Sequence, residues 1–257
     1  MILLIASRKD RASVSMSSKL LEIYDFKAVN DDIYEYKNFR LQIIDRLHIY
    51  EDMKNIDGDI DSVIFLSKHS SKADIKSLTV HPIGNFRKAE LGGYDNEIVC
   101  SNPMKMSASL RYIRNNYNGT DFEVTFEATH HGPYLQKPSF FIEIGTTENE
   151  WGRGDIQKIM VDSIINGEPM KYNSYVGIGG GHYSPKLSNY FFENNINIGH
   201  IIPKYVHEFI QKDEIENAVK KTPDCRGFLM DSHGSKGRMK QMIREISESY
   251  GLEIINI

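Results

Sequence analysis

Two adjacent histidines, His130 and His131, lie in the stretch EATHHGPYLQKPSFFIEIG, between a strand-like run and a Gly-Pro turn. Histidine titrates near neutral pH and is the commonest metal ligand, so the pair is suited to acid–base chemistry or metal binding. Adjacent side chains of an extended chain point to opposite sides, so both rings reach one metal ion only where a turn bends them together. We predict catalytic roles for His130 and His131.

A single carboxylate, Glu143, interrupts the apolar run FFIEIG that follows the histidine pair. Burying a carboxylate in an apolar strand is costly unless the group is paired, protonated or bound to a metal ion. A structural ion pair with a lysine or arginine is the alternative explanation. We predict that Glu143 is a third catalytic residue.

Further histidines stand near the ends of other strand-like runs. His69 follows SVIFLS, His81 ends LTVH, and His182 follows a run of glycines. We predict that His69, His81 and His182 bind a metal ion, although the simpler explanation for any one of them is a hydrogen-bonded loop residue. His233 follows GFLMD, so histidine stands just after four strand-like runs, at His69, at His130 with His131, at His182 and at His233, which indicates one cleft. The sequence has no HExxH motif and no CxxC pair, so no motif identifies the metal.

The glycine-rich segment GIGGGHYSPK is the second predicted part of the site. Glycines permit a close backbone approach, and their N–H groups can hold a phosphate or an oxyanion. The segment matches no nucleotide-binding fingerprint, and the alternative is a tight turn into the next helix. We predict that the substrate is bound by Gly179, Gly180, Gly181, Tyr183 and Lys186.

A basic run, DSHGSKGRMKQMIRE, lies near the expected start of the last helix. Its cations are Lys236, Arg238, Lys240 and Arg244. Cations at a helix N-terminus can contact phosphate. A solvated helix face explains the run better.

Apolar strand-like runs alternate with helical patterns along the chain. The predicted strands are Ile2–Ser7, Leu41–Leu47, Ser62–Ser67, Leu78–His81, Phe122–Ala128, Ser139–Gly145, Ser174–Gly179, Asn197–Ile202, Gly227–Asp231 and Leu252–Ile257. The predicted helices are Ser13–Ile23, Pro103–Asn116, Glu148–Asn166, Pro185–Glu193, Lys212–Lys221 and Ser235–Tyr250. The alternation predicts an α/β fold over residues 1–257 as a single domain, with a mixed, mostly parallel central sheet and helices on both faces.

Bulk composition limits the classes of partner. The chain has 257 residues, of which 40% are hydrophobic and 26% charged, as in ordinary globular proteins. Two cysteines, Cys100 and Cys225, form no disulfide framework, which favours a cytoplasmic location. The sequence has no apolar run of membrane-spanning length, so no membrane association is predicted. The net charge of −4 argues against a general nucleic-acid coat and against DNA as a partner, but it permits a local basic patch for one RNA.

Five segments together resemble a known family. They are FLSKHSS, LTVHPIGNF, ATHHGP, PSFFIEIG with TENEW, and GGGHYSPK. In this order they are similar to the archaeal and plant type of D-aminoacyl-tRNA deacylase. The resemblance extends over the whole chain and is densest between Ser62 and Lys186, while SHGSKGRMK matches the family less clearly.

The resemblance implies a substrate, a cofactor and a fold. The substrate is D-aminoacyl-tRNA, whose ester between the D-amino acid and the 3′-terminal ribose is hydrolysed. The cofactor is zinc, which lowers the pKa of a water molecule so that hydroxide can attack the ester carbonyl. The fold is similar to those of peptidyl-tRNA hydrolases and nucleoside phosphorylases, and a monomer or small homo-oligomer is expected.

Two other functions are compatible with the same residues. One is a nucleoside phosphorylase or zinc amidohydrolase on a related sheet, which would turn over nucleosides or small amides. The other is a non-catalytic protein that binds RNA ends, with structural histidines. The net charge of −4 argues against this second alternative.

Overall fold

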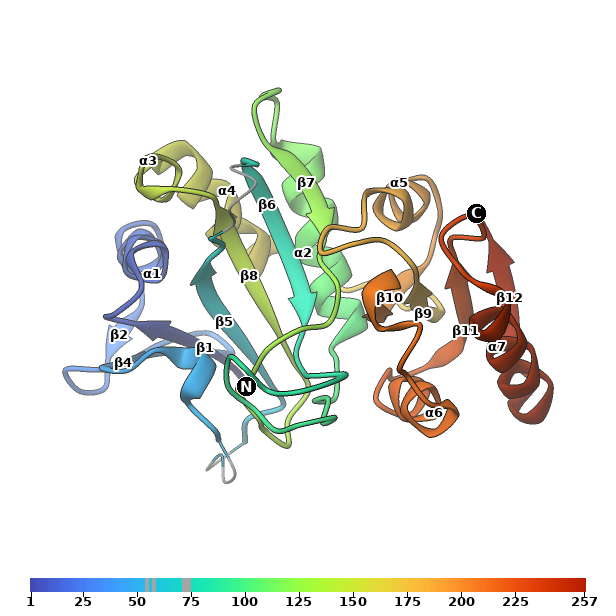
Figure 1. Ribbon diagram of the computed structural model, residues 1–257. Coiled ribbons are helices and arrows are strands. Elements are labelled where there is room, and N and C mark those ends of the chain that lie inside the picture. The colour runs from blue at the N-terminus through green and yellow to red at the C-terminus, as the bar shows by residue number, and fades with distance from the viewer. Residues whose placement is uncertain (54–55, 57–58, 71–74) are drawn as a thin grey trace.

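The computed structural model describes residues 1–53, 56, 59–70 and 75–257, and its strands form two sheets (Figure 1). The large sheet has the order β2-β3-β4-β1-β5-β8-β6-β7, and the small sheet has the order β10-β9-β11-β12. The large sheet consists of β1 (Ile2–Ser7), β2 (Lys27–Ala28), β3 (Ile33–Tyr36), β4 (Phe39–Ile44), β5 (Ser62–Lys68), β6 (Ser77–Pro82), β7 (Glu123–Phe126) and β8 (Ser139–Gly145). The small sheet consists of β9 (Ser174–Ile178), β10 (Asn197–Ile202), β11 (Cys225–Met230) and β12 (Glu253–Asn256).

Most neighbouring strands are parallel, which confirms the predicted α/β class. The antiparallel pairs are β2 with β3, β3 with β4, and β6 with β8. The helices are α1 (Arg11–Ile23), α2 (Pro103–Asn116), α3 (Glu148–Trp151), α4 (Gly154–Asn166), α5 (Pro185–Glu193), α6 (Lys212–Lys220) and α7 (Gly237–Tyr250), with short 3-10 turns η1 (His48–Tyr50) and η2 (Lys204–Val206). Within the described residues, no helix is long and apolar enough to cross a membrane.

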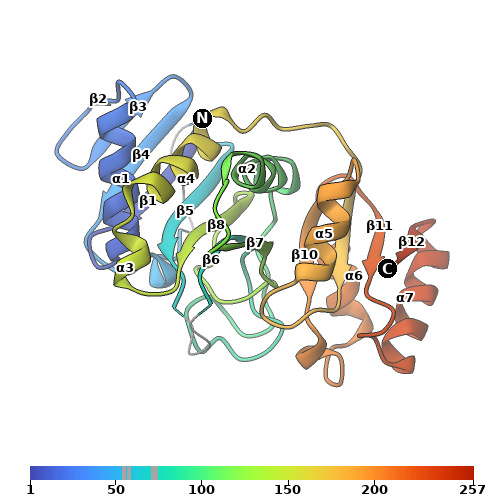
Figure 2. The ribbon, with the colours of Figure 1, turned by 90° about the horizontal axis from the view of Figure 1, so that it is seen from above.

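In the part of the chain that the structure describes, α-helices cover one face of the large sheet and not the other. Figure 2 shows α1, α4 and α2 together above β1, β5, β8 and β6. Their apolar side chains pack on alternate strand residues such as Leu78, Val80 and Ile142. The opposite face carries Phe65 and Phe141, which pack against loop residues instead. The prediction of helices on both faces is therefore wrong for the large sheet. It holds for the small sheet, where α5 lies against one face and α6 and α7 against the other.

Two local predictions differ from the structure. The helix predicted over Glu148–Asn166 is divided into α3 and α4, because Gly152 and Gly154 disfavour helix and Arg153 between them is extended. The predicted capping box at its start is present, and the Thr147 N–H donates to Glu150 Oε2 at 2.9 Å. Strands β2 and β3 were not predicted, because their half-exposed edge residues carry little apolar periodicity.

The two sheets meet along the segment that follows β7. The Ala128 N–H donates to His182 O at 2.9 Å, and the Thr129 N–H donates to Ile201 O at 3.0 Å. On the other side, His130 forms an isolated parallel bridge with Ile83, just beyond β6. The segment that carries the adjacent histidines is thus held between both sheets.

Candidate active site

The face of the large sheet that packs against loops carries polar side chains, among them His81 and Glu143. In β6, Leu78 and Val80 point to the helices, so the alternation of a strand turns His81 to the opposite face. Glu143 in β8 faces the same way as Phe141. His81 pairs with Phe141 in the ladder, and their rings stack with centroids 5.1 Å apart. Nε2 of the fully buried His81 consequently lies 3.6 Å from Glu143 Oε1.

The adjacent histidines are bent to one side by the backbone. His131 has a φ of 41°, in the left-handed region, so the chain reverses at this residue. The rings of His130 and His131 are 4.4 Å apart, and they lie 4.0 and 4.9 Å from the ring of His81. The ligand nitrogens of His81, His130 and His131 lie within 4.8 Å of one another. The turn therefore brings the rings of His130 and His131 to the same side of the chain, where both can reach one metal ion.

In all three rings Nδ1 faces a backbone carbonyl oxygen. His130 Nδ1 lies 2.7 Å, His131 Nδ1 2.8 Å and His81 Nδ1 3.0 Å from a neighbouring backbone carbonyl oxygen. A carbonyl only accepts, so each Nδ1 must carry the proton and donate it. In the neutral ring, the Nε2 lone pair is then left for another partner. His81 Nε2 is buried and makes no hydrogen bond within the described chain.

A second carboxylate, Glu127, joins the remaining histidines. Glu127 is fully buried, and its Oε1 lies 3.1 Å from His69 Nδ1. Its Oε2 lies 3.1 Å from His182 Nε2 and 3.6 Å from His130 Nε2. His69 Nδ1 also lies 3.2 Å from Glu143 Oε2, so His69 bridges both carboxylates. Two further groups with metal-ligand geometry result, one of His69, Glu127 and His182, the other of His81, Glu127 and Glu143.

Charges in the cluster are set by burial and by pairing. Burial disfavours a charged His69, but the hydrogen bonds to Glu127 and Glu143 raise its pKa to about 10. Burial also disfavours a charged His81, but the neighbouring Glu143 carboxylate raises the pKa of His81. Burial alone would raise the pKa values of both carboxyls. The neighbouring histidines nevertheless hold the pKa of Glu127 well below its usual value and also lower that of Glu143. Without a metal ion, His69 is thus a protonated donor between two carboxylates.

The exposed end of the cluster is kept neutral. Burial and the neighbouring charge of His81 lower the pKa of His130 well below its usual value. The same two causes lower the pKa of His131 to about 4. Both rings are therefore unprotonated at Nε2 near neutral pH, which is the state that a metal ligand requires.

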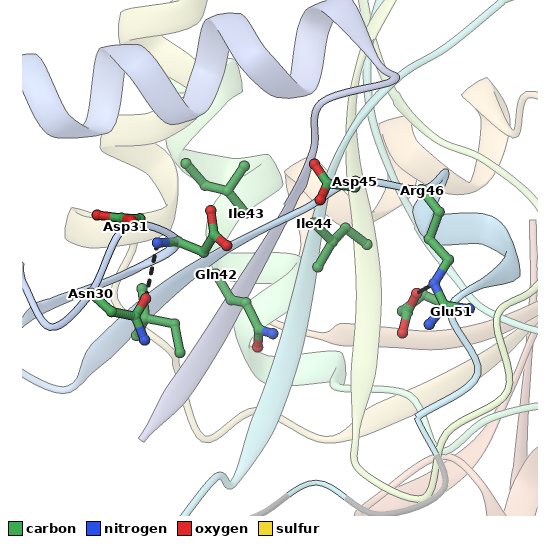
Figure 3. Close-up of a pocket in the computed structure, with 10 residues that line it drawn as sticks. Asn30, Asp31, Gln42, Ile43, Ile44, Asp45, Arg46 and Glu51 are labelled. Carbon is green, nitrogen blue, oxygen red and sulfur yellow. Dashed lines mark hydrogen bonds and ion pairs between the residues drawn. The ribbon is translucent and has the colours of Figure 1, made fainter.

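A cavity of about 310 Å³ opens onto this cluster. Its wall includes His69, His130, His131, Glu143 and His182, and apolar side chains such as Leu47 and Leu91. A larger cavity of about 730 Å³ lies beside β3 and β4 (Figure 3). Its labelled residues include Asp31, Asp45 and an Arg46–Glu51 ion pair, and its described walls include no histidine. The smaller cavity therefore has the chemistry of an active site.

Comparison with known proteins assigns the family. The model of the D-aminoacyl-tRNA deacylase family matches residues 56–255. A Picrophilus torridus protein named D-aminoacyl-tRNA deacylase is 50% identical over all of both chains. One from Thermococcus kodakarensis is 34% identical over 99% of both chains.

This chain belongs to the D-aminoacyl-tRNA deacylase family. The predicted family, fold class and deacylase function are confirmed. The crystal structure of AF0625, a conserved protein of unknown function, superposes with a TM-score of 0.92 at 30% identity, covering 100% of this chain and 95% of that one.

The structure of this deacylase-family member brings together six residues that sequence reasoning selected, and it adds one. The six are His69, His81, His130, His131, Glu143 and His182. Sequence reasoning missed Glu127, although the feature that indicates Glu143, a carboxylate in an apolar strand-like run, is also present at Glu127. Val124 and Phe126 point to the helices, so the carboxylate after FEVTF must face the cleft. His233 follows β11 in the small sheet and is absent from the described metal-ligand groups. The prediction that all four strand ends meet in one cleft is therefore wrong for His233.

Of the predicted substrate-binding residues, Tyr183 lies beside the histidine cluster and Lys186 does not. Tyr183 lies beside the cluster, with its ring 5.4 Å from that of His69. Lys186 instead donates to Asp231 Oδ1 at 2.8 Å, in the small sheet. The N–H groups of Gly179 and Gly181 donate to the carbonyls of Ile202 and Tyr183, so neither is available to an oxyanion. Only Gly180, of the three, has an N–H without a hydrogen bond in the described chain.

A buried histidine in β10 supports the loop that carries the pair, and it makes stability depend on pH. His200 donates from Nε2 to Val99 O at 2.9 Å and accepts at Nδ1 from the Thr129 hydroxyl at 3.1 Å. Burial lowers its pKa to about 3. In the unfolded chain His200 binds a proton near pH 6.5, whereas in the native state it stays neutral down to about pH 3. Stability should therefore fall as pH drops from 6.5 toward 3, by about 1.4 kcal/mol for each unit from this group.

Urea unfolding at pH 7, 6, 5 and 4 measures this effect. We expect His200→Gln to be less stable at pH 7 and to show a shallower loss on acidification than the unsubstituted protein. An unchanged slope in the variant would assign the acid sensitivity to other groups.

Proposed function

We propose that this protein hydrolyses the ester between a D-amino acid and the 3′-terminal ribose of tRNA at the histidine cluster. We further propose that His81, His130 and His131 hold a zinc ion there. The observation that carries this assignment is the common hydrogen bond from each Nδ1 to a backbone carbonyl. That bond fixes the tautomer and leaves Nε2 as the ligand, the arrangement usual for metal-binding histidines.

The ligand atoms at this site are of the types that zinc prefers. Three imidazole nitrogens with a carboxylate nearby are a common zinc environment, and His81 Nε2 is a buried atom with no described hydrogen-bond partner. The proposal exchanges roles among the predicted residues. His130 and His131 become ligands beside His81, while His69 and His182, which were predicted as ligands, pair with Glu127.

The remaining residues supply proton chemistry. A bound zinc ion would lower the pKa of a water molecule and polarise an ester carbonyl. His69 Nε2 is buried without a hydrogen-bond partner in the described chain, and the pKa of His69 near 10 keeps it protonated. In the proposed reaction, a water oxygen bonds to the carbonyl carbon, the bond from that carbon to the ribose oxygen breaks, and His69 Nε2–H protonates the released oxygen. Glu127 and Glu143 hold His69 in this state, and Glu143, which lines the cavity, takes up the one proton that the attacking water releases.

The test is release of labelled amino acid from D-Tyr-tRNA and L-Tyr-tRNA, before chelation, after chelation and after zinc is added back. We expect fast release from the D-ester alone, which chelation abolishes and zinc restores. D-selective release that survives chelation would retain the substrate and refute the metal proposal. No release from either ester would refute the proposed activity.

We also propose a cytoplasmic protein that acts on tRNA and not on DNA, as a monomer or small homo-oligomer. The two free cysteines, Cys100 and Cys225, are compatible with a reducing compartment. A single domain is supported by one cluster of buried apolar side chains that continues across both sheets, from Ile142 to Ile198 and Leu229.

A further inference from the structure

A second cavity meets the active site at the histidine pair. It has a volume of about 230 Å³ and shares His130, His131 and Leu91 with the cavity that contains Glu143. Its other walls come from the loop after β6 and from η2, which follows β10 of the small sheet. The two histidines are thus a common wall between two spaces, and a substrate that occupies both must pass its reactive bond across them.

The second cavity has the chemistry of a nucleotide site. Arg87 and Lys88 line it and are exposed, and neither forms an ion pair within the part of the chain that the structure describes. The Arg87 guanidinium lies 4.2 Å from the centre of the Phe209 ring. Tyr205 is 52% exposed, and among the described residues its ring has no aromatic neighbour and its hydroxyl no hydrogen bond. An open aromatic ring and cations without ion pairs in one cavity are the usual means of binding single-stranded RNA.

The first cavity is lined by apolar side chains and by charged groups of both signs. Its wall includes the carboxylate of Glu143, which attracts the α-ammonium group of an aminoacyl ester, while the buried Asp10 carboxylate accepts from the Ser13 and Lys68 N–H groups. Lys9 and Lys68 also line it, but the Lys68 ammonium lies over the Trp151 ring at 4.9 Å. The first cavity therefore offers the α-ammonium group one carboxylate, Glu143, and the amino-acid side chain an apolar wall at Leu47 and Leu91. The phosphate end is matched to the second, where Glu90 is the one acidic residue among the described walls.

We propose that the second cavity binds the 3′-terminal nucleotide of tRNA, with the base against Tyr205 and the adjoining phosphates at Arg87 and Lys88. The aminoacyl group then occupies the first cavity, and the ester lies at His130 and His131. This inference rests on the proposed deacylase function. It places the phosphates away from the glycine segment predicted to bind the substrate, where two of the three glycine N–H groups are already bonded.

Steady-state kinetics with D-Tyr-tRNA test the assignment. We expect Tyr205→Ala and Arg87→Ala each to raise KM on the order of 10-fold with little change in kcat, the effect of losing a stacked base or a phosphate contact. Tyr205→Phe should restore KM, because it keeps the ring. Matched controls are Tyr250→Ala, which removes a tyrosine of similar exposure (48%) at the end of α7, and Lys171→Ala, which removes an exposed charge elsewhere.

A titration with AMP separates this inference from the proposed activity. AMP should bind the unsubstituted protein and compete with D-Tyr-tRNA, and Tyr205→Ala should weaken its binding about 10-fold while Tyr250→Ala does not. Equal KM and equal AMP affinity in Tyr205→Ala and the controls would overturn the nucleotide site, even if deacylation is observed. If D-Tyr-tRNA is not hydrolysed at all, the proposed function fails, and the AMP titration still decides the nucleotide site.

Discussion

Replacing Glu127 with glutamine is expected to lower kcat/KM for D-Tyr-tRNA roughly 10³-fold, the scale on which acid–base groups contribute. Glu127 is fully buried and lies within 3.6 Å of nitrogens of His69, His130 and His182. The amide keeps the shape of the side chain but removes the charge that holds the proton on His69. The pKa of His69 should fall, and the donor to the leaving ribose oxygen should be lost.

The control for this prediction is on the same strand. Glu123→Gln changes the exposed carboxylate at the start of β7 and should leave kcat/KM within about 2-fold, as expected for a site with no part in the chemistry. Circular dichroism and zinc content of both variants separate a folding defect or metal loss from a loss of proton transfer. A folded Glu127→Gln protein with normal kcat/KM would show that the buried carboxylate has no role in the reaction.

Alanine at His130 or His131 is expected to reduce deacylation at least 10²-fold and to lower bound zinc, while the fold persists. Both rings lie at the cavity wall and are only partly buried, so their loss leaves no large void in the core. The left-handed backbone at residue 131 is strained for histidine as well, and alanine adopts this conformation only slightly less readily. Thermal unfolding should therefore show a modest decrease in Tm for His131→Ala.

His233→Ala is the matched control for the histidine pair. His233 also follows a strand, but in the described structure it joins no metal-ligand group, and its backbone N–H donates to Asp231 at 3.2 Å. Activity and zinc content of this variant should equal those of the unsubstituted protein. Full activity in both pair variants would remove His130 and His131 from the site, and a loss in His233→Ala would extend the site into the small sheet.

The sequence by itself determined the fold class, the family and most of the site residues. Strong periodicity in buried strands such as Ser139–Gly145 predicts their positions, because two-residue alternation is a local property. The same local property makes Glu143 conspicuous. Chemistry-bearing residue types at strand ends then select His69, His81, His130, His131 and His182 without any knowledge of their distances.

Only the tertiary structure decided which residues meet and in what state. Glu127 gains its role from contacts with His69, far back in the sequence, and with His182, far ahead, which no local pattern reports. His233 fits the strand-end pattern but follows a strand of the other sheet, because sheet membership depends on long-range pairing. The protonation of His69 and the neutrality of His131 are likewise products of burial and of neighbours that folding supplies.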